Sequence, residues 1–259
     1  METPLVEALR GHWRPYLMEA AGLAAFISSA SLITTLVEHA ASPVRQSVEN
    51  PFLRRTIIGV WMGLTIAALA YAPWGKRTGT HINPAVTWAF CYLGKIKTWD
   101  AVFYTLAQFA GATVGISVMA FLLARWIGDP AVNFVVTQPG PVGIVPKFSP
   151  WVAFAGEFVI SFLLMFVLLR ASASKKWEKG AAALIGVLIF LYIIFETPLS
   201  SMSLNPARTF ASAFVAHSWT AIWVYFTAPV LSMLLAAELC RRQPGLENIP
   251  NYPKEKDQD

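Results

Sequence analysis

The sequence TGTHINPAVT at residues 78–87 and the sequence SLNPAR at residues 203–208 contain the same Asn-Pro-Ala tripeptide. In both copies an apolar run follows, ending near Tyr92 in the first and near Val215 in the second. Asn is a favoured N-cap residue, and Pro suits the first helical position because its φ is already helical and its missing N–H has no partner there. Each run is too short to cross a membrane. The two copies therefore predict two half-helices.

The rest of the chain is too apolar for a water-soluble domain. Of its 259 residues, 56% are hydrophobic and 14% are charged, and the mean hydropathy is +0.52, against about 45–50% and about 25% in soluble domains. This balance disfavours a disordered chain, a disulfide scaffold and a soluble enzyme. Without sustained two-residue alternation, the apolar stretches predict helices rather than barrel strands. Six of them approach the roughly twenty residues that cross a bilayer: residues 16–37, 57–73, 99–124, 151–171, 180–198 and 219–240.

The distribution of basic residues predicts the orientation in the membrane. With six crossings, fourteen of the twenty Lys and Arg residues fall on the side that holds both termini. The positive-inside rule then places both termini in the cytoplasm. The first fifteen residues have no apolar signal-peptide core, so we expect the first span to be retained. The basic residues that give the net charge of +5 lie between the apolar segments, as membrane-flanking charges do. We therefore expect no nucleic-acid partner. We expect a multi-pass protein of the plasma membrane, the inner membrane of the cell.

The two halves of the chain repeat one another. Glu19 in the first span has a counterpart in Glu157 in the fourth. With three spans in each half, the second half must enter from the opposite side, which makes an inverted repeat with its site near the midplane. We expect one channel domain over residues 1–259, with repeats at about 10–128 and 145–242 and a mobile cytoplasmic tail at 243–259.

These residues, together with Ala107-Gln108, resemble the major intrinsic proteins, the aquaporins and glycerol facilitators, across residues 16–240. The resemblance is nearer to aquaporins. It implies a right-handed bundle with a pore through each monomer, assembly as a homotetramer in the lipid bilayer, and no cofactor, metal or catalytic residue. The half-helix N-termini would both point their partial positive charge at the pore centre, where cations and protons meet a barrier.

The candidate central residues of the pore are those of the two tripeptides. We expect Asn83 and Asn205 to donate amide hydrogen bonds to a passing water, which turns its hydrogens outward and interrupts the proton wire. Capping of the half-helices alone would also explain both Asn residues. The remaining members of the motifs are structural in either interpretation: Pro84, Ala85, Pro206 and Ala207.

Three further polar residues are expected to support the loops. A carboxylate inside a span costs about 2.5 kcal/mol or more unless it is paired or faces a polar interior. The resemblance implies that Glu19 and Glu157 accept hydrogen bonds from the loop backbone, the alternative being a proton relay. His81 is expected to brace its loop or gate the cytoplasmic mouth rather than bind a metal.

Alignment on the motifs gives the selectivity filter as Met62, Ile193, Met202 and Arg208. Arg208 fits the family, since its fixed charge repels cations and its donors bind solute oxygens; pairing with lipid phosphate is the alternative. The other three depart from it. Water-selective members typically carry an aromatic residue in span two and His in span five, and glycerol facilitators an Asp where Thr209 stands. The filter is therefore expected to be mainly apolar.

Glu196 lies three residues after Ile193 and so on a similar helical face. One hypothesis is that it pairs with Arg208 and weakens cation exclusion, and the other is a solvated or interface carboxylate.

The favoured function is a passive water channel that excludes ions and protons. The alternative is a wider channel for small neutral solutes such as glycerol, urea or hydrogen peroxide. An enzyme is disfavoured because the four His residues fall in separate segments without a catalytic motif. A proton-coupled transporter would also use an inverted repeat, and a dependence of flux on a proton gradient would reveal it.

Overall fold

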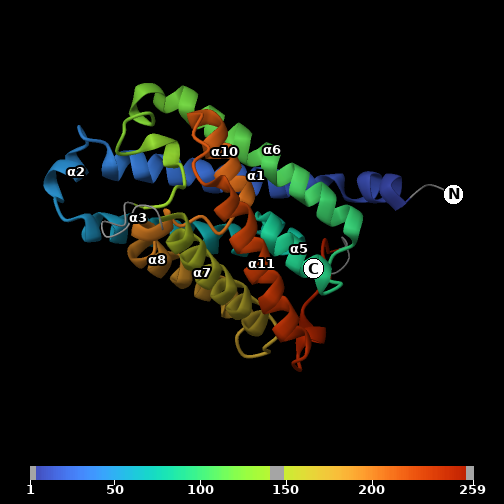
Figure 1. The fold of residues 1–259 in the computed structure, drawn as a ribbon. Coiled ribbons are helices and arrows are strands. Elements are labelled where there is room, and N and C mark those ends of the chain that lie inside the picture. The colour runs from blue at the N-terminus through green and yellow to red at the C-terminus, as the bar shows by residue number, and fades with distance from the viewer. Residues whose placement is uncertain (1–3, 141–148, 255–259) are drawn as a thin grey trace.

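A computed structural model describes residues 4–140 and 149–254, and these contain six helices long and apolar enough to cross a membrane. The six expected spans and both half-helices, α5 and α10, are confirmed (Figure 1). The fifth span ends at Phe195, earlier than expected, and a separate turn follows. The spanning helices are α1 (Pro4–Glu38), α3 (Pro51–Tyr71), α6 (Thr98–Leu123), α7 (Ser149–Ser172), α8 (Ala181–Phe195) and α11 (Ile222–Arg241).

Short helices connect the spans and enter the bundle. The half-helices are α5 (Pro84–Tyr92) and α10 (Pro206–Ala216), and the connecting helices are α2 (Pro43–Ser47), α4 (Pro73–Thr78) and α9 (Thr197–Ser200). The 3-10 turns are η1 (Ala124–Trp126), η2 (Asn133–Val135), η4 (Glu178–Gly180) and η5 (Leu246–Asn248).

The packing of the helices follows the inverted repeat. In the first half α1 packs on α6, and in the second half α7 packs on α11. Each half-helix also packs on the last span of the other half, α5 on α11 and α10 on α6. α3 and α8 form the remaining large contact between the halves. Neither half-helix can therefore bury its surface without the opposite half.

α1 begins twelve residues before the expected span and is kinked at His12, which has a non-helical φ of −122°. Pro15 explains the kink because its ring clashes with the carbonyl of residue 11 and it has no N–H to donate. The segment before the kink is attached to the bundle, since His12 Nδ1 lies 2.7 Å from Asp100 Oδ1 and Tyr16 Oη donates to the same oxygen over 2.7 Å.

α3 and α8 approach each other closely at two glycines. A Cβ added at Gly63 would lie 2.5 Å from the carbonyl oxygen of Gly186, and one added at Gly186 would lie 2.6 Å from the carbonyl oxygen of Gly63. Both distances are shorter than any real Cβ contact, so the helices must separate if either glycine gains a side chain.

We expect Gly63→Ala to lower the apparent melting temperature in detergent, because overpacking a helix contact costs about 1–3 kcal/mol. The matched control is Gly11→Ala, where an added Cβ meets nothing within 4 Å. There the same methyl group should leave stability unchanged or raise it, since Ala is about 1 kcal/mol better than Gly in a helix. Equal melting temperatures for the two variants would contradict the close approach.

Part of the C-terminal tail, which the sequence predicts to be mobile, packs on the bundle in this structure. Residues 246–254 pack on the side of the bundle where α1 begins and α11 ends, which we call the terminal side. Ile249 is 2% exposed, and Tyr252 pairs with Ile96 in an isolated parallel bridge. Residues 141–148 of the loop between the halves, and 255–259 of the tail, lie outside the described residues.

Candidate functional site: a pore between the two halves

One cavity of about 900 Å³ runs along the bundle axis between the two halves. Residues from both ends of α3, Pro51 and Tyr71, line it. A helix of this length spans about 30 Å at 1.5 Å per residue, which is the thickness of the hydrocarbon layer. The cavity therefore extends from one side of the membrane region to the other, as a pore requires.

The loop that precedes α5 is held by a buried carboxylate. Glu19 on α1 accepts hydrogen bonds from the backbone N–H groups of His81 and Ile82 over 3.1 and 2.5 Å. Gln108 Nε2 on α6 donates to the same carboxylate over 2.8 Å and to Thr87 Oγ1 over 3.0 Å. Glu19 is fully buried, so these donors provide the partners that water would otherwise supply.

The loop that precedes α10 is held in the same way. Glu157 on α7 accepts from the backbone N–H groups of Ser203 and Leu204 over 2.6 and 2.8 Å. Ser200 Oγ donates to it over 2.7 Å. With every carboxylate oxygen of both glutamates engaged with the loops, the geometry supports bracing over a proton relay.

Both loops share an unusual backbone. The residue before each Asn, Ile82 and Leu204, has a positive φ of 35° and 61°, and so does the residue two positions earlier, Thr80 at 48° and Met202 at 50°. Non-glycine residues in this region store strain of about 1–3 kcal/mol and persist only where the surroundings fix them. The N–H bonds to the two glutamates fix Ile82 and Leu204. Thr80 N donates to Thr78 Oγ1 over 3.2 Å, and Met202 N donates to Ser200 Oγ over 3.1 Å.

The Asn residues of the two motifs join the loops to each other. Each Oδ1 caps its own half-helix, Asn83 accepting from Ala85 N over 2.9 Å and Asn205 from Ala207 N over 3.1 Å. The capping predicted from sequence is therefore confirmed. Pro84 and Pro206 occupy the first helical positions, and Ala85 and Ala207 are fully buried beside them.

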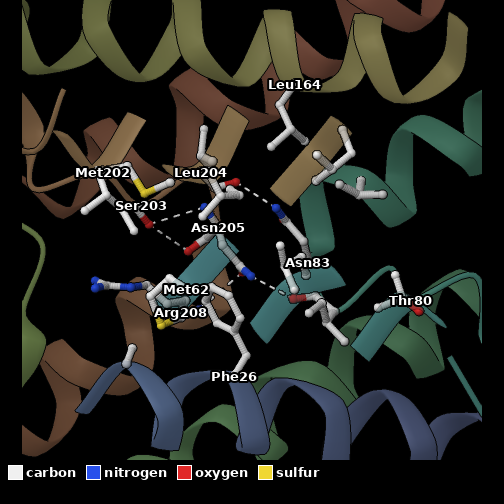
Figure 2. A pocket seen from close by; sticks show the side chains of 18 of the residues that line it. Phe26, Met62, Thr80, Asn83, Leu164, Met202, Ser203, Leu204, Asn205 and Arg208 are labelled. Atoms are coloured by element: carbon white, nitrogen blue, oxygen red, sulfur yellow. Dashed lines mark hydrogen bonds between the residues drawn. The ribbon is translucent and has the colours of Figure 1, made fainter. Parts of the chain in front are cut away.

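Each Asn nitrogen also donates across the pore axis. Asn83 Nδ2 donates to Leu204 O over 2.8 Å, and Asn205 Nδ2 donates to Ile82 O over 2.7 Å, as Figure 2 shows. An amide nitrogen carries two hydrogens. One hydrogen of each Asn is thus used to lock the loops, and the other is left for a solute in the cavity.

The four residues expected to form the filter line the same cavity: Met62 from α3, Ile193 from α8, Met202 from the loop before α10, and Arg208 from α10. Figure 2 shows Met62, Met202 and Arg208 beside one another on one side of the Asn pair. The Arg208 Nη1 atom is buried without a hydrogen-bond partner in the described part of the chain. The Arg208 side chain as a whole is partly exposed and lines the cavity, so its guanidinium group can meet a solute oxygen.

A chain of hydroxyl groups supports the loop beside Arg208. Thr137 Oγ1, from the connection between the halves, lies 2.7 Å from Thr209 Oγ1. Thr209 Oγ1 in turn lies 2.5 Å from Ser203 Oγ. Ser203 Oγ in turn donates to Asn205 O over 3.0 Å. This row of hydroxyl groups includes Thr209, the position at which glycerol facilitators typically carry an Asp. It ends at Asn205 of the second motif.

The hypothesis that Glu196 pairs with Arg208 is wrong. Both carboxylate oxygens of Glu196 are buried and make no hydrogen bond among the described residues. The carboxylate instead lies against α7, where a Cβ added at Gly156 would be 2.6 Å from Glu196 Oε1. Glu196 is the C-cap of α8 and its N–H still donates to Tyr192 O over 2.8 Å, so the side chain turns towards α7 although the helical spacing from Ile193 reaches it.

His81 is buried between its loop and the terminal side. Its Nδ1 lies 3.2 Å from Thr87 Oγ1, and its ring centroid lies 4.6 Å from that of Phe90 and 5.4 Å from that of Tyr104. No group of His, Cys, Asp and Glu side chains in the described ranges could hold a metal ion.

Two residues that line the pore, and one that supports α10 beside it, could not be identified from the sequence. Phe26 on α1 points into the cavity opposite the Asn pair (Figure 2). Tyr252 lines the cavity at the terminal side, and Thr137 contacts Thr209 at the start of α10. Phe26 could not be identified because an apolar residue in a spanning helix looks the same in the sequence whether it faces the lipid or the pore.

Comparison with known proteins assigns the same architecture. The family model described as "Major intrinsic protein" matches residues 12–239. The chain is 30% identical to Aquaporin-4 of Mus musculus over 91% of the chain and 70% of that protein, and 37% identical to Aquaporin NIP6-1 of Arabidopsis thaliana over 70% and 53%. It spans 53–63% of the length of three NIP-type plant relatives. The X-ray structure of the aquaglyceroporin from Plasmodium falciparum has a TM-score of 0.72 at 19% identity, covering 89% of this chain and 96% of that one.

Proposed function

We propose that this chain, which belongs to the major intrinsic protein family of channels, passes water across a membrane and excludes ions and protons. The observation that carries the proposal is the Asn pair at the centre of a cavity that extends between the two sides. A water molecule there accepts from the free amide hydrogen of each Asn and turns its own hydrogens away. The aligned half-helix N-termini add a barrier to cations.

A wider channel for small neutral solutes is the second candidate, and the composition of the filter favours it. Met62, Ile193 and Met202 offer no strong polar group, so a water molecule in the filter has Arg208 as its main side-chain partner. Methionine side chains are flexible and adapt to the shape of a solute. Similarity to NIP-type plant aquaporins and to an aquaglyceroporin fold fits either candidate.

Stopped-flow light scattering on proteoliposomes separates the two candidates. Fast shrinkage under an impermeant osmolyte without later swelling in glycerol or urea supports the water channel. Entry of glycerol or urea at a comparable rate replaces it with the neutral-solute channel. Flux that follows a proton gradient contradicts both and indicates a coupled transporter.

Asn205→Asp is expected to weaken proton and cation exclusion and to lower water flux. The substitution removes the Nδ2 donor that bonds Ile82 O and places a carboxylate beside that carbonyl. A negative charge at the pore centre attracts the cations that the half-helix N-termini repel. Proton flux measured with a pH-sensitive dye inside the vesicles tests this. Proton flux equal to that of the unaltered protein would show that Asn205 only caps its half-helix.

The assembly and orientation are part of the proposal. The protein would assemble as a homotetramer in a plasma membrane, and the fourteen-to-six distribution of basic residues supports both termini in the cytoplasm. Large apolar side chains of α3, such as Val60, Trp61 and Leu64, are exposed on the single chain. Mass measurement in detergent tests the tetramer, and labelling of cysteines placed in the tail of vesicle-embedded protein tests the orientation.

A further inference from the structure

The C-terminal strap, residues 246–254, is attached to three different loops of the terminal side. Tyr252 N donates to Lys95 O over 2.8 Å, and Lys95 Nζ donates to Ile249 O over 2.7 Å. Lys254 N donates to Arg77 O over 3.0 Å. At its start, Asn248 Nδ2 donates to Ala173 O over 3.1 Å. The strap thus connects the loop after α5, the turn of α4 and the connection from α7 to α8.

Tyr252 packs directly on the loop that carries the first Asn-Pro-Ala motif. Its ring centroid lies 5.6 Å from that of His81 and 5.9 Å from that of Phe90, both edge-on. A Cβ added at Gly79, which has a φ of 82°, would lie 3.0 Å from the Tyr252 ring. The tight contact requires a glycine there, and it lies four residues before Asn83.

The same ring forms part of the wall of the pore. Tyr252 and Lys254 line the cavity that also holds Asn83, Asn205 and Arg208. Burial raises the pKa of Tyr252 to about 12, so the phenol is neutral at physiological pH and acts through its size. Lys254 adds a positive charge to the mouth.

The strap is short compared with the spans and lies beyond the last of them. It follows α11 as a largely irregular segment; besides the hydrogen bonds named above, it buries Ile249 and Pro253 and packs Leu246 and Tyr252 against the core. Short segments near a chain end open at a lower free-energy cost than the helices of the core. The strap can therefore leave the mouth without dismantling the bundle, and the pore wall would change when it does.

We propose that Tyr252 is a permeation-determining residue, and that the strap is a displaceable constriction of the mouth on the terminal side. With the strap in place, the ring of Tyr252 narrows access to the first motif. With the strap displaced, the mouth is wider and solutes enter faster. The inference rests on the proposed channel function but not on which neutral solute passes.

The test compares water and glycerol flux through proteoliposomes of four variants. Tyr252→Ala should raise flux by about twofold or more, since the removed ring no longer narrows the mouth. Tyr252→Phe keeps the ring and should match the unaltered protein. Tyr92→Ala is the matched control, because that tyrosine is exposed on the same side and does not line the cavity. Ile249→Asp should release the strap with Tyr252 intact and should also raise flux.

The outcomes separate this inference from the proposed function. Increased flux in Tyr252→Ala and Ile249→Asp, with Tyr252→Phe unchanged, supports the constriction. Unchanged or lower flux in a folded Tyr252→Ala overturns it and leaves the strap a structural clamp, while flux through the unaltered protein keeps the channel function. No flux of water or neutral solute through the unaltered protein contradicts the proposed function itself. Elution as a single species from size-exclusion chromatography shows that each variant is folded.

Discussion

Replacing Glu157 with Ala is expected to abolish flux and to lower the stability of the protein in detergent sharply. The change leaves the N–H groups of Ser203 and Leu204 and the hydroxyl of Ser200 without their acceptor. Each unsatisfied buried donor costs about 1–3 kcal/mol, so the total loss should be at least about 3 kcal/mol. The strained backbone at Leu204 would then relax and move Asn205 away from the pore. Thermal unfolding and stopped-flow water flux measure the two effects.

Two variants control for this result. Glu49→Ala removes an exposed carboxylate and should change neither stability nor flux. Glu157→Gln keeps the size of the side chain and one accepting oxygen, but its NH₂ group meets a backbone N–H, so an intermediate loss is expected. If Glu157→Ala behaved like Glu49→Ala, the loop would have to be satisfied by water, and the bracing interpretation would be wrong for both glutamates.

Replacing Arg208 with Val should raise glycerol and urea permeability by about tenfold and weaken the exclusion of cations. The guanidinium group is the main strong side-chain donor beside Met62, Ile193 and Met202, and its Nη1 atom has no partner in the described chain. Without it the constriction becomes wider and loses its fixed charge. Stopped-flow swelling in glycerol and an ion-flux assay on the same vesicles measure the two effects.

A second substitution at the same position separates charge from shape. Arg208→Lys keeps the positive charge but loses the planar fork of donors, so cation exclusion should persist while glycerol entry rises. Arg125→Val removes an exposed arginine at the end of α6 and should change neither property. Glycerol entry and ion flux in Arg208→Val equal to those of the unaltered protein would place the constriction elsewhere, for example at Phe26.

Much of the fold could be predicted from sequence because a bilayer restricts the choices. Uncharged stretches of about twenty residues can cross it only as helices or barrel strands, and the Asn-Pro pairs mark where α5 and α10 begin. The bounds of the half-helices follow from capping chemistry that is local in sequence. The short helices α2, α4 and α9 were not predicted, because single turns carry no periodic signal.

The residues that line the site could largely be predicted from the sequence, but their geometry could not. The positive φ angles at Thr80 and Ile82 fall on residues that normally avoid that region, and the one at Ile82 depends on a carboxylate about sixty residues away. The bond between Asn83 and the opposite loop is equally remote in sequence. The packing of Tyr252 on His81 was missed for the same reason, since a polar tail with a few apolar residues gives no local sign of its partner.

The cross-bonds between the two loops also impose an order on biogenesis. The bond from Asn83 to Leu204 joins residues 121 positions apart. Because a chain emerges from the ribosome N-terminus first, the acceptor for Asn83 does not yet exist when α5 has been made. An irregular loop with unpaired polar groups is unfavourable at membrane depth. The first re-entrant segment must therefore wait, hydrated, until the second is synthesised, and the permeation path closes off from lipid as the last event of insertion.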